Sequence, residues 1–260
     1  MPRPRVAWSA HGAGLGLVVL ALLALEPGRA RAEVFLDAYT GINFTQDADL
    51  KVKQNSVGND FTVHDLSYGS RWTEGAPYWG VRAGYFFGED PAWFGLAVEF
   101  FHFKVVGETA DTRDITGTHA GQPINVRAPV NTVVQRFESS NGVSYLTLDL
   151  IARWGLLVED YYDEYPHGRL QLYVGVGAGP VFTYARSTID GASKTAGYEV
   201  AGPGVQGFAG VRFLLFKYVG LFAEGKFTHS DLTMSVAKGG HADLTEQSFH
   251  VVGGLSIVLP

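Results

Sequence analysis

Apolar and polar residues alternate with a period of two along eight segments of this chain. Successive side chains of a β-strand point to opposite faces, so this alternation predicts strands with one apolar face and one polar face. In residues 145–154, for example, Leu148 and Leu150 fall on one face, whereas Asp149 and Arg153 fall on the other. No long segment shows the apolar period of a helix. The predicted strands are residues 34–44, 79–87, 93–101, 145–154, 170–184, 205–216, 219–228 and 249–259.

The lengths of these segments and of their connections indicate a membrane barrel. Each segment has about nine to fifteen residues, and a tilted strand needs roughly 9–11 to cross the hydrocarbon core of a bilayer. The connections alternate between short turns and four long polar segments, 46–77, 105–142, 186–203 and 231–247. Periplasmic turns and outer loops alternate in the same way in bacterial barrels. The sequence therefore predicts an all-β fold: an eight-stranded antiparallel up-and-down transmembrane β-barrel with short periplasmic turns and long outer loops.

The composition fits this class of protein. Hydrophobic residues make up 46% of the chain beside only 18% charged residues, and 33 residues are glycine. After the first 32 residues no run of 18 apolar residues occurs, so no membrane-spanning helix is expected there. A transmembrane β-barrel explains both the high hydrophobic content and the absence of a long apolar run, because only every second residue of its strands is apolar. A soluble periplasmic barrel of the lipocalin type, with its apolar faces inside, is an open alternative.

The N-terminal residues 1–32 have the pattern of a secretory signal peptide. Two arginines precede an apolar run at residues 14–25, and the small residues Ala30 and Ala32 follow at the positions that signal peptidase reads, which is the order of a secretory signal. We therefore expect residues 33–260 to form the mature outer-membrane barrel domain. Without the first 32 residues the net charge changes from −6 to −9, and so acidic a chain is a poor candidate for nucleic-acid binding.

Polar residues on the non-apolar faces predict the content of the barrel interior. An unpaired charge in a low-dielectric interior costs several kcal/mol, and eight strands enclose a lumen only wide enough for side chains. Because four carboxylates face four cations, we expect a plugged lumen held by ion pairs rather than a water-filled pore. The predicted lumen charge network comprises Asp37, Arg82, Glu99, Asp149, Arg153, Arg212, Glu224 and Lys226.

Three glycines at 175, 177 and 179 invite a phosphate-binding interpretation, which their spacing does not support. The third glycine comes one position early for a dinucleotide fingerprint, and Pro180 follows it where a helix should begin. A spacing of two instead places Gly175, Gly177 and Gly179 on the lumen face of one strand. We expect them to leave room for bulky arginine and lysine side chains from other strands.

No catalytic, metal or cofactor site is predicted. His229, Ser230 and Asp231 are consecutive, but neighbouring residues of a strand point to opposite faces, so they do not form a triad. His241, Asp243, Glu246 and His250 are spread over a loop and a strand start. The chain has no cysteine, which removes thiolate chemistry, cysteine metal sites and disulfides.

Residues 77–87, 93–104, 141–154 and 218–232 carry a family resemblance. They are similar to outer-membrane barrel proteins related to a lipid A oxidase, within the superfamily of small outer-membrane barrels that includes the OmpA and OmpX types. Two features depart from the pattern: the chain ends in Leu-Pro rather than in an aromatic residue, and residues 139–142 lack a histidine.

This resemblance implies a location in the outer membrane of a Gram-negative bacterium. It also implies insertion by the barrel assembly machinery, contact with outer-membrane lipid or lipopolysaccharide, and a monomeric state. The function expected is a structural or interaction role at the cell surface. A lipid A-modifying enzyme, of the oxidase or deacylase type, is the alternative.

Overall fold

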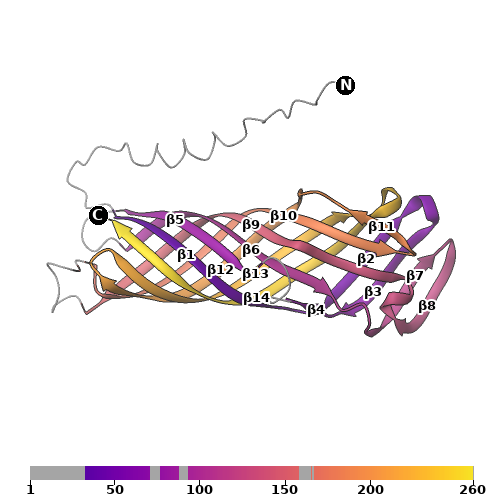
Figure 1. The fold of residues 1–260 in the computed structure, drawn as a ribbon, viewed down its shortest axis with the longest axis horizontal. Coiled ribbons are helices and arrows are strands. Elements are labelled where there is room, and N and C mark those ends of the chain that lie inside the picture. The colour runs from indigo at the N-terminus through magenta and orange to yellow at the C-terminus, as the bar shows by residue number, and fades with distance from the viewer. Residues whose placement is uncertain (1–32, 71–76, 88–92, 158–164, 166, 260) are drawn as a thin grey trace, which may run out of the picture.

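The computed structural model describes residues 33–70, 77–87, 93–157, 165 and 167–259 of the 260-residue chain. Within them, eight long antiparallel strands form a barrel that closes where the last strand pairs with the first (Figure 1). Apart from Trp93, every predicted segment lies inside one of these strands, so the predicted eight-stranded up-and-down barrel is confirmed. The barrel strands are β1 (Glu33–Thr45), β5 (Trp79–Phe87), β6 (Phe94–Gly107), β9 (Val134–Leu156), β10 (Leu170–Ile189), β12 (Glu199–Phe216), β13 (Val219–Ser235) and β14 (His241–Leu259).

The four connections predicted as polar loops are long, but much of their described length is β-structure. Their polar outward faces, such as Lys51 and Lys53 in β2, lower the local hydropathy, while the alternate residues Leu50 and Val52 point into the protein. Short strands of this kind resemble loops in composition, which is why the sequence did not reveal them. The additional elements are β2 (Ala48–Gln54), β3 (Asn59–Leu66), β4 (Tyr68–Gly69), β7 (Thr112–His119), β8 (Gln122–Pro129), β11 (Ala192–Thr195) and the 3-10 turns η1 (Asn55–Val57), η2 (Val130–Thr132) and η3 (Ala237–Gly239).

The barrel has two halves along its axis. The proximal half contains the first residue of β1 and the last residue of β14, and the turn between β12 and β13 lies at its end (Figure 1). The distal half contains β2, β3, β7, β8 and β11 together with the far ends of the barrel strands (Figure 1). The β2–β3 hairpin pairs with β14, and β7 then pairs with β3 and β8, which extends the wall beyond the eight strands.

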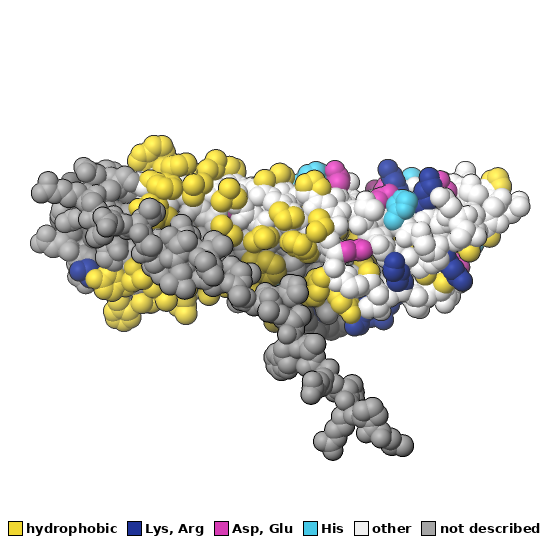
Figure 2. Space-filling view, turned by 90° about the horizontal axis from the view of Figure 1, so that it is seen from above, with side chains coloured by type: hydrophobic (Ala, Val, Ile, Leu, Met, Phe, Trp, Pro, Cys, Tyr) yellow, Lys and Arg dark blue, Asp and Glu magenta, His cyan; other side chains and the backbone are white. Residues whose placement is uncertain are grey.

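Outward-facing apolar side chains gather around the proximal half, which we call the apolar belt (Figure 2). On β9 the belt runs from Leu146 to Leu156, and on β14 from Phe249 to Leu259. Alternation along the strands is strict here: Leu148 is 60% exposed, whereas the next side chain, Asp149, is fully buried. Apolar faces thus point outward and charged faces inward, which is opposite to the lipocalin-type alternative.

Large aromatic residues lie at both edges of the belt. Trp79 and Phe249 mark its distal edge, and Trp93, Trp154 and Phe216 mark its proximal edge. Such aromatic girdles are typical of barrel proteins at the two interfaces between membrane and water. Among the described residues no helix is long and apolar enough to cross a membrane.

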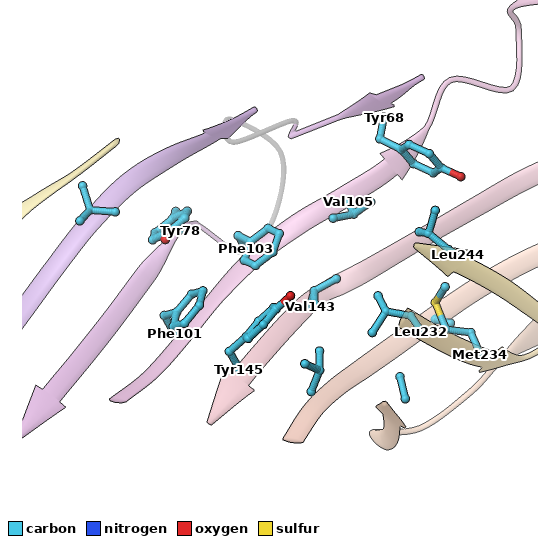
Figure 3. Close-up of a cluster of buried hydrophobic side chains, with 14 of the residues drawn as sticks. Tyr68, Tyr78, Phe101, Phe103, Val105, Val143, Tyr145, Leu232, Met234 and Leu244 are labelled. Carbon is cyan, nitrogen blue, oxygen red and sulfur yellow. The ribbon is translucent and has the colours of Figure 1, made fainter. Parts of the chain in front are cut away.

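The interior changes character between the two halves. The charged lumen residues lie in the proximal interior, whereas the distal interior is mainly apolar (Figure 3) and contains a few buried polar groups such as Glu246. Rings of Phe101, Phe103 and Tyr145 stack at centroid distances of 5.0–6.1 Å at the boundary. On the distal side of these rings, Leu232, Met234 and Leu244 from β13 and β14 lie near Val105 of β6 and Val143 of β9 (Figure 3).

Candidate functional site

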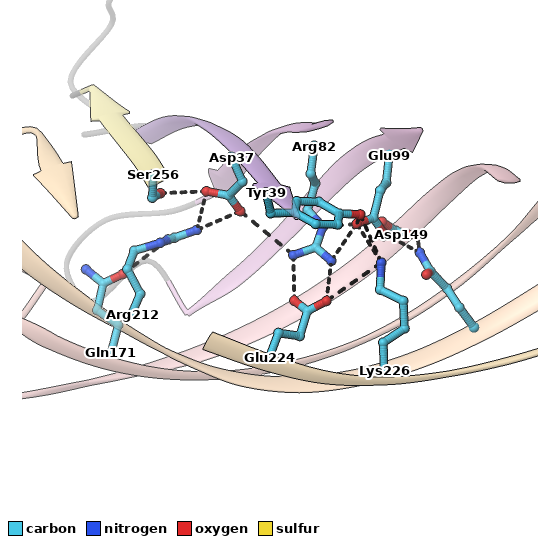
Figure 4. Close-up of polar contacts among 11 residues, drawn as sticks. Asp37, Tyr39, Arg82, Glu99, Asp149, Gln171, Arg212, Glu224, Lys226 and Ser256 are labelled. Atoms are coloured by element: carbon cyan, nitrogen blue, oxygen red, sulfur yellow. Dashed lines mark hydrogen bonds and ion pairs between the residues drawn. The ribbon is translucent and has the colours of Figure 1, made fainter. Parts of the chain in front are cut away.

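All eight charged residues predicted for the lumen point into it and are at most 3% exposed. Their direction follows from the two-residue period of the strands, because each occupies the face opposite the apolar belt. They come from six different strands, so only closure of the barrel brings them together; Figure 4 shows all of them except Arg153. The strand positions are Asp37 in β1, Arg82 in β5, Glu99 in β6, Asp149 and Arg153 in β9, Arg212 in β12, and Glu224 and Lys226 in β13.

Arg82 is the centre of this network. Its Nη1 and Nη2 donate to the two carboxylate oxygens of Glu224 at 2.8 and 3.0 Å, a two-pronged geometry that matches the planar guanidinium to the carboxylate. The Nη2 atom also lies 2.9 Å from Oε1 of Glu99. Arg82 therefore contacts carboxylates from two strands. Because one positive charge balances only one of these two negative charges, a second cation is needed.

Lys226 is that second cation. Its Nζ donates to Oε1 of Glu99 at 2.7 Å and lies 3.7 Å from Oε1 of Glu224. It also donates to the hydroxyl of Tyr39 at 3.1 Å, and this hydroxyl in turn donates to Glu99. Arg82, Lys226, Glu99 and Glu224 thus form a charge-balanced group of four.

A second pair lies closer to the proximal end. Nη2 of Arg212 donates to both carboxylate oxygens of Asp37 at 3.1 Å, and Ser256 donates to the same carboxylate at 2.5 Å. The two groups are connected, because Nη1 of Arg82 lies 3.8 Å from Oδ2 of Asp37. The group around Arg82 and the Arg212–Asp37 pair therefore form one continuous network along the lumen.

Arg153 and Asp149 occupy the two remaining positions of the predicted set. Arg153 pairs with Glu33, the first described residue, which the sequence prediction did not include. Asp149 accepts a hydrogen bond from Nε2 of Gln206 at 2.8 Å and lies 3.8 Å from Nε of Arg82. Asp149 thus borders the charge-balanced group of four and is held by Gln206, whereas Arg153 forms a separate pair with Glu33 at the proximal mouth.

Aromatic rings line the charged groups on several sides. The guanidinium of Arg82 lies 4.2 Å from the ring centroid of Phe208, and Nζ of Lys226 lies 4.0 Å from that of Phe101. Arg153 lies 3.8 Å from the ring of Phe86. Cations attract the faces of such rings, so these inward phenylalanines support the cations while excluding water from the network.

The three lumen glycines lie where other groups occupy the space of a side chain. A Cβ atom at Gly175 would overlap the ring of Phe208, and one at Gly177 would overlap the carboxylate of Asp149. A Cβ atom at Gly179 would overlap the carbonyl oxygen of Leu146 in β9. The nearest groups are thus a phenyl ring, a carboxylate and a neighbouring backbone, rather than the arginine and lysine side chains expected from the sequence.

The consecutive residues His229, Ser230 and Asp231 divide between the two faces of β13. Ser230 is buried inside and receives a hydrogen bond from Tyr145 at 2.9 Å, whereas Asp231 is exposed and accepts from Thr245 at 2.7 Å. His229 contacts Gln247 at 3.1 Å on the outer face. They therefore do not form a triad.

The candidate metal ligands are likewise separated. His241 and Asp243 lie on the outer face of β14, 3.8 Å apart, whereas Glu246 and His250 are buried inside. In the described part of the chain, no group of three or more histidine, aspartate or glutamate side chains is arranged to hold a metal ion.

Glu246 belongs to a buried hydroxyl cluster that the sequence did not indicate. The residue lies beyond Phe249, the distal end of the apolar belt on β14. Its carboxylate accepts from Tyr145 at 2.5 Å, from Thr228 at 3.2 Å and from Ser230 at 3.3 Å. Burial raises the pKa of Glu246, and the surrounding hydroxyl donors only partly oppose this shift.

A histidine–serine pair lies on the outward face at the distal edge of the belt. Nδ1 of His102 is 3.0 Å from the hydroxyl of Ser144, and the two residues are direct cross-strand partners in β6 and β9. Trp79 stacks against His102 with a centroid distance of 6.3 Å. A base next to a hydroxyl is the first requirement of a serine nucleophile. However, His102 and Ser144 are only 5% and 2% exposed.

Comparison with known proteins finds similarity at the level of shape. No family model matches the chain, and no curated protein matches it. Neisserial surface protein A is 10% identical, with 87% of this chain and 96% of that one covered and a TM-score of 0.38. OprG from Pseudomonas aeruginosa is 11% identical, with coverages of 89% and 98% and a TM-score of 0.39. The outer-membrane protease OmpT from Escherichia coli is 8% identical, with coverages of 87% and 97% and a TM-score of 0.44.

The strand pairing of this chain itself identifies its architecture. Eight antiparallel strands in chain order close by pairing of β14 with β1. The eight-stranded up-and-down architecture that the resemblance to the OmpA and OmpX type predicted is therefore confirmed.

Proposed function

We propose that the protein is an outer-membrane β-barrel with a plugged lumen and a structural or interaction role at the cell surface. In this arrangement the proximal half spans the bilayer and the distal half projects from the cell. The apolar belt supports the membrane location, because a soluble protein rarely exposes so large a continuous apolar surface. The aromatic residues at both edges of the belt support it independently.

The filled lumen is the observation that carries the proposed absence of a pore. Arg82 and Lys226 are held between Glu99 and Glu224 in the proximal half. Stacked aromatic and aliphatic side chains fill the distal half above them. An ion would therefore have to cross both a buried ion-pair network and a layer of mainly apolar side chains.

Planar-bilayer recordings test this proposal. The purified protein is reconstituted beside a general porin, which controls for insertion and for the sensitivity of the measurement. We expect the current to equal that of the protein-free bilayer. Binding of an antibody to the distal half verifies separately that the barrel has inserted. Stepwise conductance that scales with the amount of inserted protein would contradict the plugged lumen.

The distal half has a fixed shape, which suits a surface for contact with lipopolysaccharide or a partner protein. Asp190, after β10, accepts from Asn59 of the β2–β3 hairpin at 2.8 Å and lies 2.8 Å from Nε2 of His119 of the β7–β8 hairpin. These contacts join three outer connections that are far apart in the sequence. Insertion by the barrel assembly machinery and a monomeric state are part of the same proposal.

Surface labelling tests the orientation of the barrel. Because the natural chain has no cysteine, a single Gln122→Cys variant places one thiol at the tip of the β7–β8 hairpin, and Tyr218→Cys places one at the proximal end. A membrane-impermeant maleimide should label the first variant on intact cells and the second only after the outer membrane is opened. The reverse result would invert the proposed orientation.

Lipid A modification is the second candidate function, and the His102–Ser144 pair is the observation that favours it. The pair faces outward at the distal edge of the belt, close to where lipid A would lie. Its burial opposes catalysis, because a lipid ester must reach the serine hydroxyl. Mass spectrometry of lipid A from cells that express the wild type or Ser144→Ala tests this candidate, and identical lipid A profiles with and without the gene would eliminate it.

A further inference from the structure

An apolar groove crosses the outward surface of the barrel near its proximal end. It has a volume of about 360 Å³ and lies over β6, β9 and β10. The side chains of Trp93, Phe94, Leu150, Ala152, Val174 and Val176 line it. The groove is part of the apolar belt, but it is recessed, whereas most of the belt consists of projecting side chains.

The small side chain of Ala152 is the reason for the recess. Ala152 pairs directly with Phe94 on one side and with Val174 on the other, so a methyl group lies between a phenyl ring and a branched side chain. The backbone of Ile151 and Gly175 completes the floor, because residue 151 directs its side chain into the lumen and residue 175 has none. Trp93, which is 58% exposed, forms one end wall.

We propose that this groove binds one acyl chain of a phospholipid from the periplasmic leaflet of the membrane. This inference rests on the proposed membrane location of the barrel. The floor and the flanking side chains of this shallow recess offer a flexible hydrocarbon chain more van der Waals contact than a flat surface does. The lining is almost wholly apolar, so a chain loses no hydrogen bonds on entering it.

The position of the groove distinguishes phospholipid from lipid A. Trp93 lies in the proximal girdle, at the same end as Glu33 of β1, Leu259 of β14 and the turn between β12 and β13. In the proposed orientation that end faces the periplasm, and lipid A occupies the opposite leaflet. Arg169 precedes β10 on the periplasmic side of the groove, about 17 Å along the strand from Val174 at 3.3–3.4 Å per residue, where its Nε donates to the carbonyl of Leu214 at 3.2 Å.

Quenching of Trp93 fluorescence by brominated phospholipid tests the proposal. In the reporter protein the other tryptophans of the mature chain, Trp72, Trp79 and Trp154, are replaced by phenylalanine. The protein is reconstituted in phosphatidylethanolamine and phosphatidylglycerol vesicles with increasing fractions of lipid brominated in the upper part of one acyl chain. We expect half-maximal quenching at a several-fold lower fraction than for a second reporter that retains only Trp154.

Matched variants locate the effect in the groove. Ala152→Phe fills the recess and should make the quenching curve of Trp93 coincide with that of Trp154. Ala209 pairs with Val174 at the same depth, on the far side of β10 from the groove, so Ala209→Phe adds equal bulk without filling it. This control should leave the Trp93 curve unchanged.

The outcomes separate failure of this inference from failure of the membrane location. If Trp93 and Trp154 are quenched with equal dependence on brominated lipid, and Ala152→Phe changes nothing, the groove does not bind a chain. If brominated lipid quenches neither tryptophan, the belt does not face a membrane, and the proposed function is wrong as well.

Discussion

The guanidinium of Arg82 in β5 spans the lumen to bind both carboxylate oxygens of Glu224 in β13, three strands away around the wall, at 2.8 and 3.0 Å. Both side chains are buried, and Glu99 and Lys226 complete a neutral group around them. This contact ties non-adjacent strands of the barrel together through its interior. Backbone pairing, in contrast, joins only adjacent strands.

Removing the Arg82 side chain should destabilise the barrel strongly. Arg82→Met leaves Glu224 and Glu99 with one cation between them, and breaking a buried ion pair from one side costs about 3–5 kcal/mol. The measurement is the midpoint of urea-induced unfolding in lipid vesicles, followed by the heat-modifiable shift on gels. Arg136→Met provides a control, because Arg136 pairs with Glu138 at 2.6 Å but is half-exposed. If the urea midpoint falls equally in the two variants, the lumen network contributes no more stability than a half-exposed ion pair.

The Arg82–Glu224 pair shows how much of the lumen could be predicted from the sequence. The alternation of polar and apolar residues places Arg82 and Glu224 on the inner face, because the side chains of a strand alternate strictly. It does not give the height of each residue along the barrel axis, which depends on the stagger between strands. For this reason the set of eight charges could be predicted, but the partner of each charge could not.

Other parts of the site had weaker signals in the sequence. Glu33, the partner of Arg153, lies at the predicted start of the mature chain, outside every alternating segment. Glu246 lies in a segment predicted as a loop, and its partners are hydroxyl groups, which give no charge pattern. The distal strands were missed for a similar reason, because short strands with threonine, aspartate and lysine outside have the composition of loops.

Adding a side chain at Gly177 should block folding. A Cβ atom at this position overlaps the carboxylate of Asp149, and Gly177→Leu would force apart the network around Asp149 and Gln206. Gly207 in the neighbouring β12 faces outward, and nothing lies within 4 Å of a Cβ atom built there. Gly207→Leu should therefore fold normally. The yield of heat-modifiable barrel after refolding measures both variants, and normal folding of Gly177→Leu would disprove this account of the glycine stretch.

A charge in the apolar belt should be much more harmful than one in the distal half. Leu148 points outward within the belt, and arginine on a lipid-facing site near the bilayer middle costs about 2–4 kcal/mol. Thr62 faces outward from β3 in the distal half, as the neighbour of Lys51 in β2. Thr62→Arg should have little effect on unfolding in vesicles, whereas Leu148→Arg should lower the urea midpoint. If both variants unfold at the wild-type midpoint, lipid does not surround residue 148.

The buried Glu246 should make stability fall as the pH rises. Its folded-state pKa is raised by burial, so the folded protein binds the proton more tightly than the unfolded chain does. Stability is then fully present below the unfolded pKa of about 4.3 and decreases as the pH rises towards the folded pKa.

A glutamine at position 246 would keep the shape of the protonated acid without this loss. We therefore expect Glu246→Gln to match the wild type near the unfolded pKa and to melt at a higher temperature at neutral and alkaline pH. Glu138→Gln, which removes the partner of the half-exposed Arg136 in β9, is the control and should not reproduce this pH-dependent gain. A constant difference in melting temperature across the whole pH range would show that titration of Glu246 is not its cause.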